Sequence, residues 1–161
     1  MTVADRIEAL LAQHAVPYET IEHSAARSAD EIAQLRGTPL EIGGKSIVMK
    51  VDRVGFCVLA IRASDAIDNR AFRKHLGARR YRFATLDELD ELTGLTPGRV
   101  PPFGRPIFDL PLYVEASLAE NPRIAFTPGT KTRSMTLATR DWLRAAQPDD
   151  VFAFGKARTQ I

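Results

Sequence analysis

The sequence predicts an α+β fold in which helices surround a mixed, largely antiparallel sheet. The candidate helices and strands do not alternate strictly along the chain, and several strands follow one another as hairpins. The length of 161 residues, with 45% hydrophobic and 26% charged residues, suits one compact domain over residues 1–161 and argues against two full domains.

The first elements are indicated by periodicity and by a capping pattern. Apolar residues recur at helical spacing over residues 3–11, which predicts an opening helix. Alternating side chains favour a short strand over residues 18–23. Ser28 and Glu31 have the spacing of a capping box, so we expect a second helix that stops near Gly37.

The clearest hairpin lies in the middle of the first half. Residues 46–52 and 56–61 are apolar and rich in β-branched side chains, and Gly55 between them can supply the positive φ of a tight turn. The pattern then predicts helix, strand and helix over residues 69–76, 80–83 and 85–93, with Thr85 and Glu88 as a second capping pair.

A stiff loop follows over residues 95–104, which contain too much proline and glycine for a helix or a central strand. Short strands are expected at residues 107–110 and 112–114. Two more, at 123–127 and 132–137, frame a turn at Pro128 and Gly129. A final helix is expected over residues 139–145, with Thr139 as its cap or first residue.

Charge and cysteine content exclude several classes of function. Lysine and arginine number 22 against 20 acidic residues, so the net charge of +2 argues against a general nucleic-acid coat and favours local contacts. The single cysteine, Cys57, forms no internal disulfide and no multi-cysteine zinc site. The chain shows neither a signal-peptide pattern nor an apolar run of roughly 20 residues, so a cytoplasmic protein is predicted.

The run from Gly43 to Ser46 is similar to a phosphate-binding loop, but its spacing is wrong. The first glycine of that motif would fall on Pro39, and a β-type run follows Ser46 where a helix is required. Nucleotide hydrolysis is therefore not predicted. A DNA-binding role gains no support either, because no helix-turn-helix pattern is found.

Lys45 and His23 each allow two interpretations from the residues alone. Lys45 follows two glycines at the start of a candidate interior strand, where its charge could meet a ligand that approaches the backbone, or it could be a solvated lysine. His23 ends a strand and begins a loop, a usual place for ligand contacts, although a satisfied or exposed histidine is the alternative.

No protein nucleophile or metal site is indicated. The three histidines lack metal-ligand spacing, and Cys57 lies in an apolar strand where an inert thiol is expected. No Gly-x-Ser-x-Gly elbow surrounds any serine.

Four segments, taken together, resemble the sequence pattern of one protein family. They are Tyr18-Glu-Thr-Ile-Glu-His23, Gly44-Lys45-Ser46-Ile-Val-Met49, Leu92-Thr-Gly-Leu-Thr-Pro-Gly98-Arg-Val-Pro-Pro102-Phe-Gly104 and Phe126-Thr-Pro-Gly129. In this order and spacing the chain resembles the YbaK/prolyl-tRNA editing family, relatives of the editing domain inserted in bacterial prolyl-tRNA synthetases. The third segment is the most specific, because the Gly-x-x-x-Pro loop of that family maps onto Gly98 to Pro102.

The resemblance implies the fold of the synthetase-associated editing domain. It also implies an activity, which is the deacylation of mischarged aminoacyl-tRNA. The favoured substrate is tRNA for proline that carries a wrong amino acid. In the family a lysine at the start of an interior strand is most closely tied to activity, which favours the functional interpretation of Lys45. The family is thought to use groups of the substrate in the reaction, so no cofactor or metal is expected. We expect Lys45 and Gly98 to be catalytic, with backbone N–H groups from Gly98 to Val100 stabilising the oxyanion.

The resemblance also implies a set of residues that bind the substrate: His23, Ser46, Arg99, Val100, Pro102, Thr127 and Gly129. Arg99 stands where the family often has a second glycine, which leaves the amino-acid specificity open. The expected partner is the aminoacylated acceptor end of mischarged tRNA, and no membrane is expected. Recruitment by an aminoacyl-tRNA synthetase and formation of a homodimer stay open, as does a non-catalytic module of the same fold that binds tRNA ends or a synthetase.

Overall fold

A computed structural model of the protein describes residues 1–158, and two sheets dominate it. The larger is five-stranded, with β5, β2 and β3 antiparallel and β6 and β9 added in parallel. A three-stranded antiparallel sheet has the order β1, β8, β7, and a two-stranded one pairs β10 with β4. The bounds of the strands are β1 Glu19–Glu22, β2 Gly44–Val51, β3 Gly55–Arg62, β4 Asp65–Ile67, β5 Tyr81–Phe83, β6 Leu112–Glu115, β7 Arg123–Phe126, β8 Arg133–Ala138, β9 Asp150–Phe152 and β10 Gly155–Ala157.

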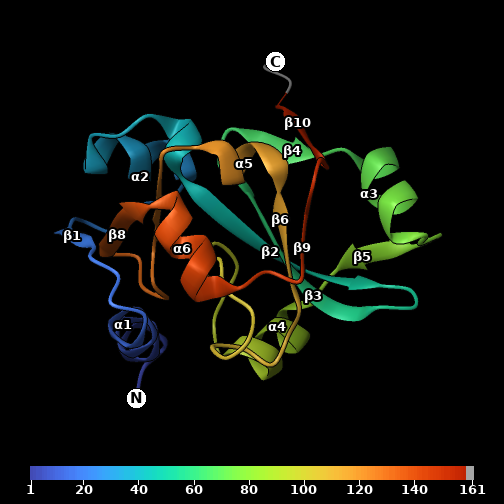
Figure 1. Cartoon of the computed structure of the whole chain (residues 1–161), viewed down its shortest axis with the longest axis horizontal. Coiled ribbons are helices and arrows are strands. Elements are labelled where there is room, and N and C mark those ends of the chain that lie inside the picture. The colour runs from blue at the N-terminus through green and yellow to red at the C-terminus, as the bar shows by residue number, and fades with distance from the viewer. Residues whose placement is uncertain (159–161) are drawn as a thin grey trace.

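The helices lie around these sheets (Figure 1), so the predicted α+β fold with a mixed, mostly antiparallel sheet is confirmed. Their bounds are α1 Val3–Gln13, α2 Ala29–Arg36, α3 Asn69–Leu76, α4 Leu86–Thr93, α5 Ala116–Glu120 and α6 Thr139–Ala146, with a 3₁₀ turn η1 at Leu40–Ile42. Within residues 1–158, none of these helices has the length and apolar character needed to cross a membrane.

The predicted caps of α2 and α4 are present. Ser28 Oγ accepts a hydrogen bond from the Glu31 amide at 3.1 Å, and Gly37 ends α2 with φ of 74°. Thr85 and Glu88 form the complete capping box of α4. The cap position of α6 is held by Ala138, without a side-chain hydrogen bond, and Thr139 is the first helical residue.

The core lies on both faces of the central sheet. Val58 and Ala60 of β3 face a cluster that contains Phe103, Phe126 and Trp142. The alternate residues of the same strand, Cys57 among them, face a second cluster around Phe72 and Phe154. Cys57 is fully buried as predicted, and this burial raises the pKa of its thiol to about 12, so the nucleophilic thiolate is not formed.

The strand predicted at residues 107–110 is wrong. The amides of Ile107 and Phe108 donate to the Gly104 carbonyl, and the Arg105 amide donates to the Leu110 carbonyl, so the segment is a closed turn. Its apolar side chains are buried in the core, which produces the same apolar run as a strand does. The prediction also omitted η1, α5, β4, β9 and β10, which have three to five residues each.

Candidate functional site

A cavity of about 290 Å³ lies where the two larger sheets meet, under helix α2. The sheets are joined there by a parallel bridge between Gly43 and Ala125. A Cβ atom on Gly44 would come within 2.8 Å of Ile124 Cδ1, so this glycine allows β2 to pack closely against β7. The walls come from α2, the start of β2, the end of β7 and the loop over residues 97–100.

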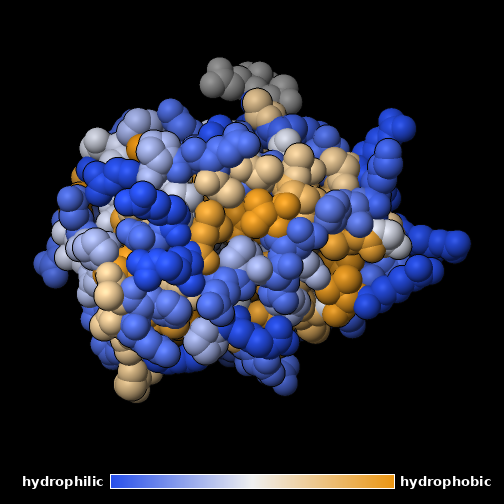
Figure 2. Space-filling model, viewed as in Figure 1, coloured by the Kyte–Doolittle hydropathy of each residue, from blue (hydrophilic) through white to orange (hydrophobic). Residues whose placement is uncertain are grey.

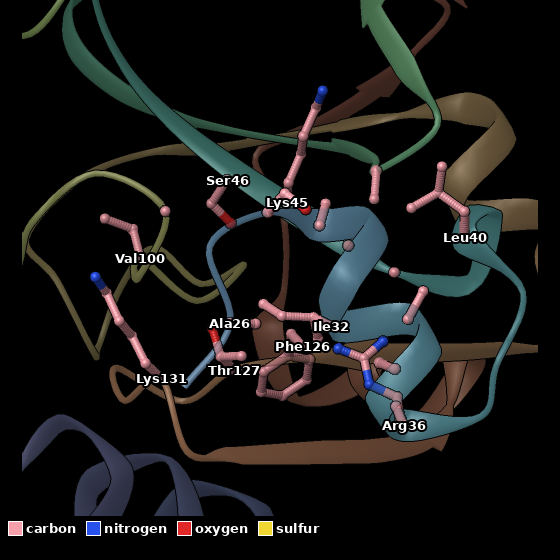
Figure 3. A pocket seen from close by; sticks show the side chains of 18 of the residues that line it. Ala26, Ile32, Arg36, Leu40, Lys45, Ser46, Val100, Phe126, Thr127 and Lys131 are labelled. Carbon is pink, nitrogen blue, oxygen red and sulfur yellow. The ribbon is translucent and has the colours of Figure 1, made fainter. Parts of the chain in front are cut away.

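Lys45 lies at one border of the cavity, on the second residue of β2. Its Nζ donates a hydrogen bond of 2.6 Å to the Asp65 carbonyl. Burial lowers the pKa of the amine, and the charge of Arg158 lowers it further, whereas the Asp65 carboxylate acts in the opposite direction. Figure 3 shows the side chain extending away from Arg36 and Phe126.

The loop over residues 97–100 forms another wall. Gly98 has φ of 83°, a conformation that favours glycine, and Val100 is buried against the cavity. The Arg99 amide donates to the Thr96 carbonyl at 3.1 Å, so it is not available as an oxyanion donor. The predicted set of donors is therefore reduced to the Gly98 and Val100 amides, which have no acceptor among residues 1–158.

Arg36 of α2 is 9% exposed and also lines the cavity. One of its terminal nitrogens donates to Ser134 Oγ at 3.2 Å, while its Nε has no hydrogen-bond partner in the described chain. Burial lowers the pKa of the guanidinium group to about 10, so the group is still charged at neutral pH. Among residues 1–158, no carboxylate forms an ion pair with Arg36, so its positive charge is uncompensated in this part of the chain.

His23 acts on Arg36 through Ser134. The Nδ1 atom of His23 lies 2.9 Å from the Ser24 carbonyl, and Nε2 lies 2.8 Å from Ser134 Oγ. Because a carbonyl oxygen only accepts, Nδ1 donates to the Ser24 carbonyl, and in the tautomer with a single ring proton Nε2 accepts from the Ser134 hydroxyl. The lone pairs of that hydroxyl oxygen are then directed to Arg36. His23 thus orients the group that holds Arg36, and it does not itself line the cavity.

The substrate-binding residues expected from the sequence fall into two groups. Ser46, Val100 and Thr127 line the cavity together with the expected catalytic residues Lys45 and Gly98. The remaining four, which are His23, Arg99, Pro102 and Gly129, are not among its lining residues.

Pro102 and Gly129 are placed by packing of the loops around the cavity. The Pro102 carbonyl accepts a hydrogen bond of 2.9 Å from Trp142 Nε1, which fastens the loop to α6. Gly129 has φ of 86° in the turn between β7 and β8 and lies against Val3 and Leu95. Both residues support the cavity from outside.

Residues 23–145 match the model of the aminoacyl-tRNA editing domain family. The chain belongs to this family. This aminoacyl-tRNA editing domain is 38% identical over 149 residues to the "Multifunctional Ser/Thr-tRNA deacylase ProXp-y" of Escherichia coli (strain K12), covering 89% of the chain and 88% of that relative. It is also 34% identical over 102 residues to the proline–tRNA ligase of Burkholderia thailandensis, where the match covers 59% of the chain and 18% of the ligase.

A solved structure described as a proposed trans-editing enzyme for prolyl tRNA synthetase has the same fold, with a TM-score of 0.81 and 24% identity over 98% of this chain and 99% of that one. The family predicted from the four segments is thus confirmed, and the editing domain is an aminoacyl-tRNA hydrolase. Among its residues 1–158, no group of three or more His, Cys, Asp and Glu side chains is arranged to hold a metal ion.

Arg36 of this editing domain is a site residue that the motifs of the sequence did not predict. A basic residue in the last turn of a helix is ordinarily explained by the helix dipole. The missed signal is the spacing, because Ala29, Ile32, Ala33 and Arg36 follow the i, i+3, i+4, i+7 pattern of one helix face. All four line the cavity, so the arginine lies on the inward face of α2.

Proposed function

We propose that this editing domain hydrolyses, in trans, the ester of tRNA mischarged with serine or threonine. The observation that supports this substrate class is the presence of two buried polar groups at the cavity that lack a full set of protein partners, Arg36 Nε and Ser46 Oγ. The name of the Escherichia coli relative, which matches along 88% of its length, agrees with a hydroxyl-bearing amino acid.

The size and polarity of the cavity suit a small polar side chain. Its volume of about 290 Å³ is at the lower end of the range of ligand pockets, which is about 300–1,000 Å³. Figure 3 shows the guanidinium group of Arg36 beside Phe126 and Ile32, so a polar donor lies within an otherwise apolar part of the cavity. A substrate hydroxyl can accept from Arg36, whereas a methyl group of similar size leaves the buried donor unpaired. That asymmetry gives much stronger discrimination than the size of one methyl group does.

The chemistry assigned to the protein is positioning and electrostatic stabilisation. Lys45 provides a positive charge for the phosphate or the aminoacyl end, and the Gly98 and Val100 amides stabilise the oxyanion that forms on the ester carbonyl. A water molecule, activated by a hydroxyl group of the substrate, adds to the carbonyl carbon. The bond to the ribose oxygen then breaks and that oxygen takes the proton, which releases the amino acid and the tRNA.

A second candidate substrate is tRNA for proline that carries a wrong amino acid, as the resemblance implied. The similarity to proline–tRNA ligases, at 34% identity over 102 residues of one of them, favours it. The two candidates differ in the determinant of selectivity, which is the amino acid in the first and the tRNA in the second.

The test is a deacylation assay with a panel of tRNAs charged with serine, threonine, alanine or cysteine, each on tRNA for proline and on one other tRNA. We expect hydrolysis of the hydroxyl amino acids to be faster than that of alanine by about 100-fold or more. Lys45→Ala should lower kcat/KM by about 100–1,000-fold, the usual loss for one electrostatic group, with an unchanged circular dichroism spectrum.

Lys74→Ala, at an exposed position of α3, is the matched control for Lys45→Ala. Near-normal turnover by Lys45→Ala would remove Lys45 from the mechanism. Binding without turnover by the wild-type protein, across the whole panel, would contradict both candidate substrate classes.

A further inference from the structure

We propose that a groove beside the cavity, along strand β5, binds the RNA strand that leads to the aminoacylated 3′ end. This inference rests on the proposed function, because it identifies the part of the substrate that lies outside the cavity. The groove has a volume of about 1120 Å³ and lies between β2, β5, β4 and the first turns of α3. Lys45 lines both the groove and the cavity, so the two hollows adjoin at this residue.

The charge of the groove is strongly one-sided. One acidic residue, Asp52, lines it, against the cationic residues Lys45, Lys50, Arg73, Arg79, Arg80 and Arg82. The whole chain has a net charge of only +2, so positive charge is concentrated here. The Asp52 carboxylate accepts hydrogen bonds of 3.1 and 3.3 Å from the Arg79 amide and is therefore partly occupied by the backbone.

Three of the groove arginines have side chains available for phosphates. Arg73, Arg79 and Arg80 are exposed and form no ion pair with any carboxylate in residues 1–158. A guanidinium group is more weakly hydrated than an ammonium group, and its planar set of donors matches phosphate oxygens. A polyanion is thus the complementary ligand for this surface.

An exposed aromatic ring lies at the same groove. Phe83, the last residue of β5, is 65% exposed. Figure 2 shows apolar surface reaching the exterior between hydrophilic side chains on the right of the view, where Figure 1 shows β5. A protein partner would also cover an apolar ring, but the surrounding positive charge favours an unpaired RNA base, which stacks on aromatic side chains while its phosphates meet arginines.

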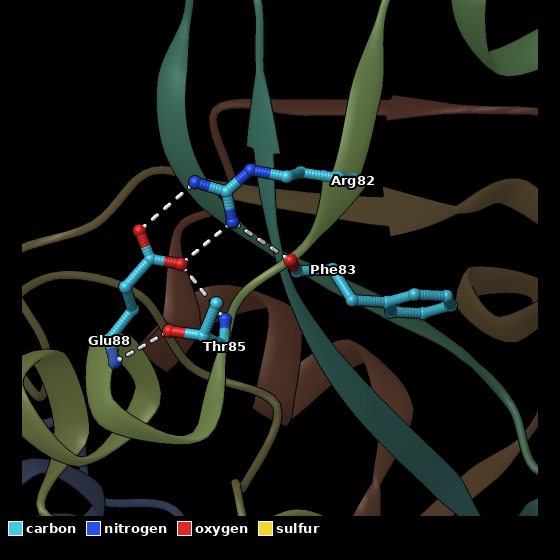
Figure 4. A network of polar contacts seen from close by, with 4 residues as sticks. All are labelled: Arg82, Phe83, Thr85 and Glu88. Atoms are coloured by element: carbon cyan, nitrogen blue, oxygen red, sulfur yellow. Dashed lines mark hydrogen bonds and ion pairs between the residues drawn. The ribbon is translucent and has the colours of Figure 1, made fainter.

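A set of polar contacts fixes the backbone that carries this ring (Figure 4). Arg82 makes two hydrogen bonds to the Glu88 carboxylate, of 2.7 and 3.0 Å, and a third of 3.1 Å to the Phe83 carbonyl. Glu88 also accepts from the Thr85 amide at 2.9 Å. The end of β5 is thereby held to the start of α4, while the ring itself points away from these contacts. Because the backbone is already held, little backbone entropy is lost when a base stacks on the exposed ring.

The test measures equilibrium binding of uncharged tRNA at several salt concentrations. The double variant Arg79→Gln/Arg80→Gln should bind about ten-fold or more weakly, and the slope of log affinity against log salt should fall by about 1.5, since each phosphate contact contributes about 0.7–0.9. Phe83→Ala should weaken binding about ten-fold through lost stacking, with no change in that slope.

Arg140→Gln on α6 and Leu86→Ala on α4, which is 70% exposed, are matched controls outside the groove and should stay within about two-fold of wild type. Wild-type affinity and slope in the groove variants would overturn the proposal. So would equal effects of Phe83→Ala on full tRNA and on an RNA duplex that lacks the single-stranded 3′ end.

Binding of uncharged tRNA requires no turnover, so this test gives an answer even if the proposed deacylation is not observed. Where turnover is observed, the ratio of kcat/KM on aminoacyl-tRNA to kcat/KM on aminoacyl-adenosine should fall in the groove variants by the same factor as the affinity. A ratio equal to that of wild type would contradict a role of the groove in catalysis.

Discussion

The cavity and the groove share Lys45, but the cavity contains a buried arginine, whereas the arginines of the groove are exposed to solvent. In the cavity, Arg36 is buried, forms no ion pair with a carboxylate of residues 1–158 and donates a hydrogen bond to Ser134. In the groove, Arg79 and Arg80 are exposed and free of ion pairs within the described chain. A buried cation discriminates, because a ligand without an acceptor leaves it unsatisfied. Exposed cations increase the affinity for a polyanion, and added salt weakens this contribution by screening the charges. We therefore expect substitutions in the cavity to change substrate selectivity and substitutions in the groove to change the affinity for tRNA.

The largest effect is expected from replacing Arg36, the buried cation to which we assign substrate selectivity. In Arg36→Met the preference for seryl-tRNA over alanyl-tRNA should fall about 10–100-fold, because a hydrogen bond to a charged group contributes about 1.5–3 kcal/mol. The melting temperature should stay the same or rise, because the variant no longer buries an uncompensated charge. The measurements are kcat/KM on the two charged tRNAs and thermal unfolding.

Arg140→Met, at an exposed position of α6, is the control for Arg36→Met and should change neither quantity. If Arg36→Met unfolds readily but keeps its preference for serine, Arg36 is structural and the cavity selects by shape. That result would mean that the buried Arg36 contributes no more to substrate selectivity than the exposed arginines of the groove do.

A smaller effect is expected at the loop over residues 97–100, which lines the cavity. Gly98 has φ of 83° and open space around the position of a Cβ atom, so Gly98→Ala introduces backbone strain of about 1–2 kcal/mol without a steric clash. The strain should shift the Gly98 and Val100 amides and lower kcat about ten-fold, while KM for tRNA stays close to wild type. Steady-state kinetics separate the two parameters.

Gly55→Ala is a close match for Gly98→Ala, because Gly55 has φ of 91° and equally open surroundings in the turn between β2 and β3. It should show a similar loss of stability and full activity. Equal losses of kcat in both variants would mean that strain alone, and not the position of the loop amides, explains the effect.

The residues of the cavity that the sequence predicted are those that belong to short motifs of neighbouring residues. Lys45 and Gly98 lie in local motifs, and the capped helices α2 and α4 begin where their Ser28 and Thr85 signals indicate. The helical spacing of Ala29, Ile32, Ala33 and Arg36 places Arg36 on one face of α2. The spacing shows neither which strands that face covers nor that Arg36 forms no ion pair among residues 1–158. Strands of three residues, such as β9, are too short to show periodicity, and their pairing is set by distant segments.

The smallest expected effect concerns acid stability on the groove side. Hydrogen bonds from Arg82 and from the Thr85 amide lower the pKa of Glu88 from its ordinary 4.5 to about 2. A carboxyl group whose pKa is lower in the folded state stabilises the protein above pH 4.5, and this contribution is lost as the pH falls toward 2. Glu88→Gln should therefore be less stable than wild type at neutral pH, and the difference should close between pH 4.5 and 2.

Urea unfolding across this pH range measures the difference between wild type and Glu88→Gln. High salt should reduce it, because the Arg82–Glu88 pair is at the surface. Asp87→Asn, the neighbouring exposed acid of α4, is the control and should not reproduce the pH dependence. A difference that persists at pH 2 would show that the charge of Glu88 is not what holds the end of β5 in place. Since the cavity contains neither residue, deacylation of aminoacyl-adenosine should be the same in both variants, which again distinguishes the groove from the cavity.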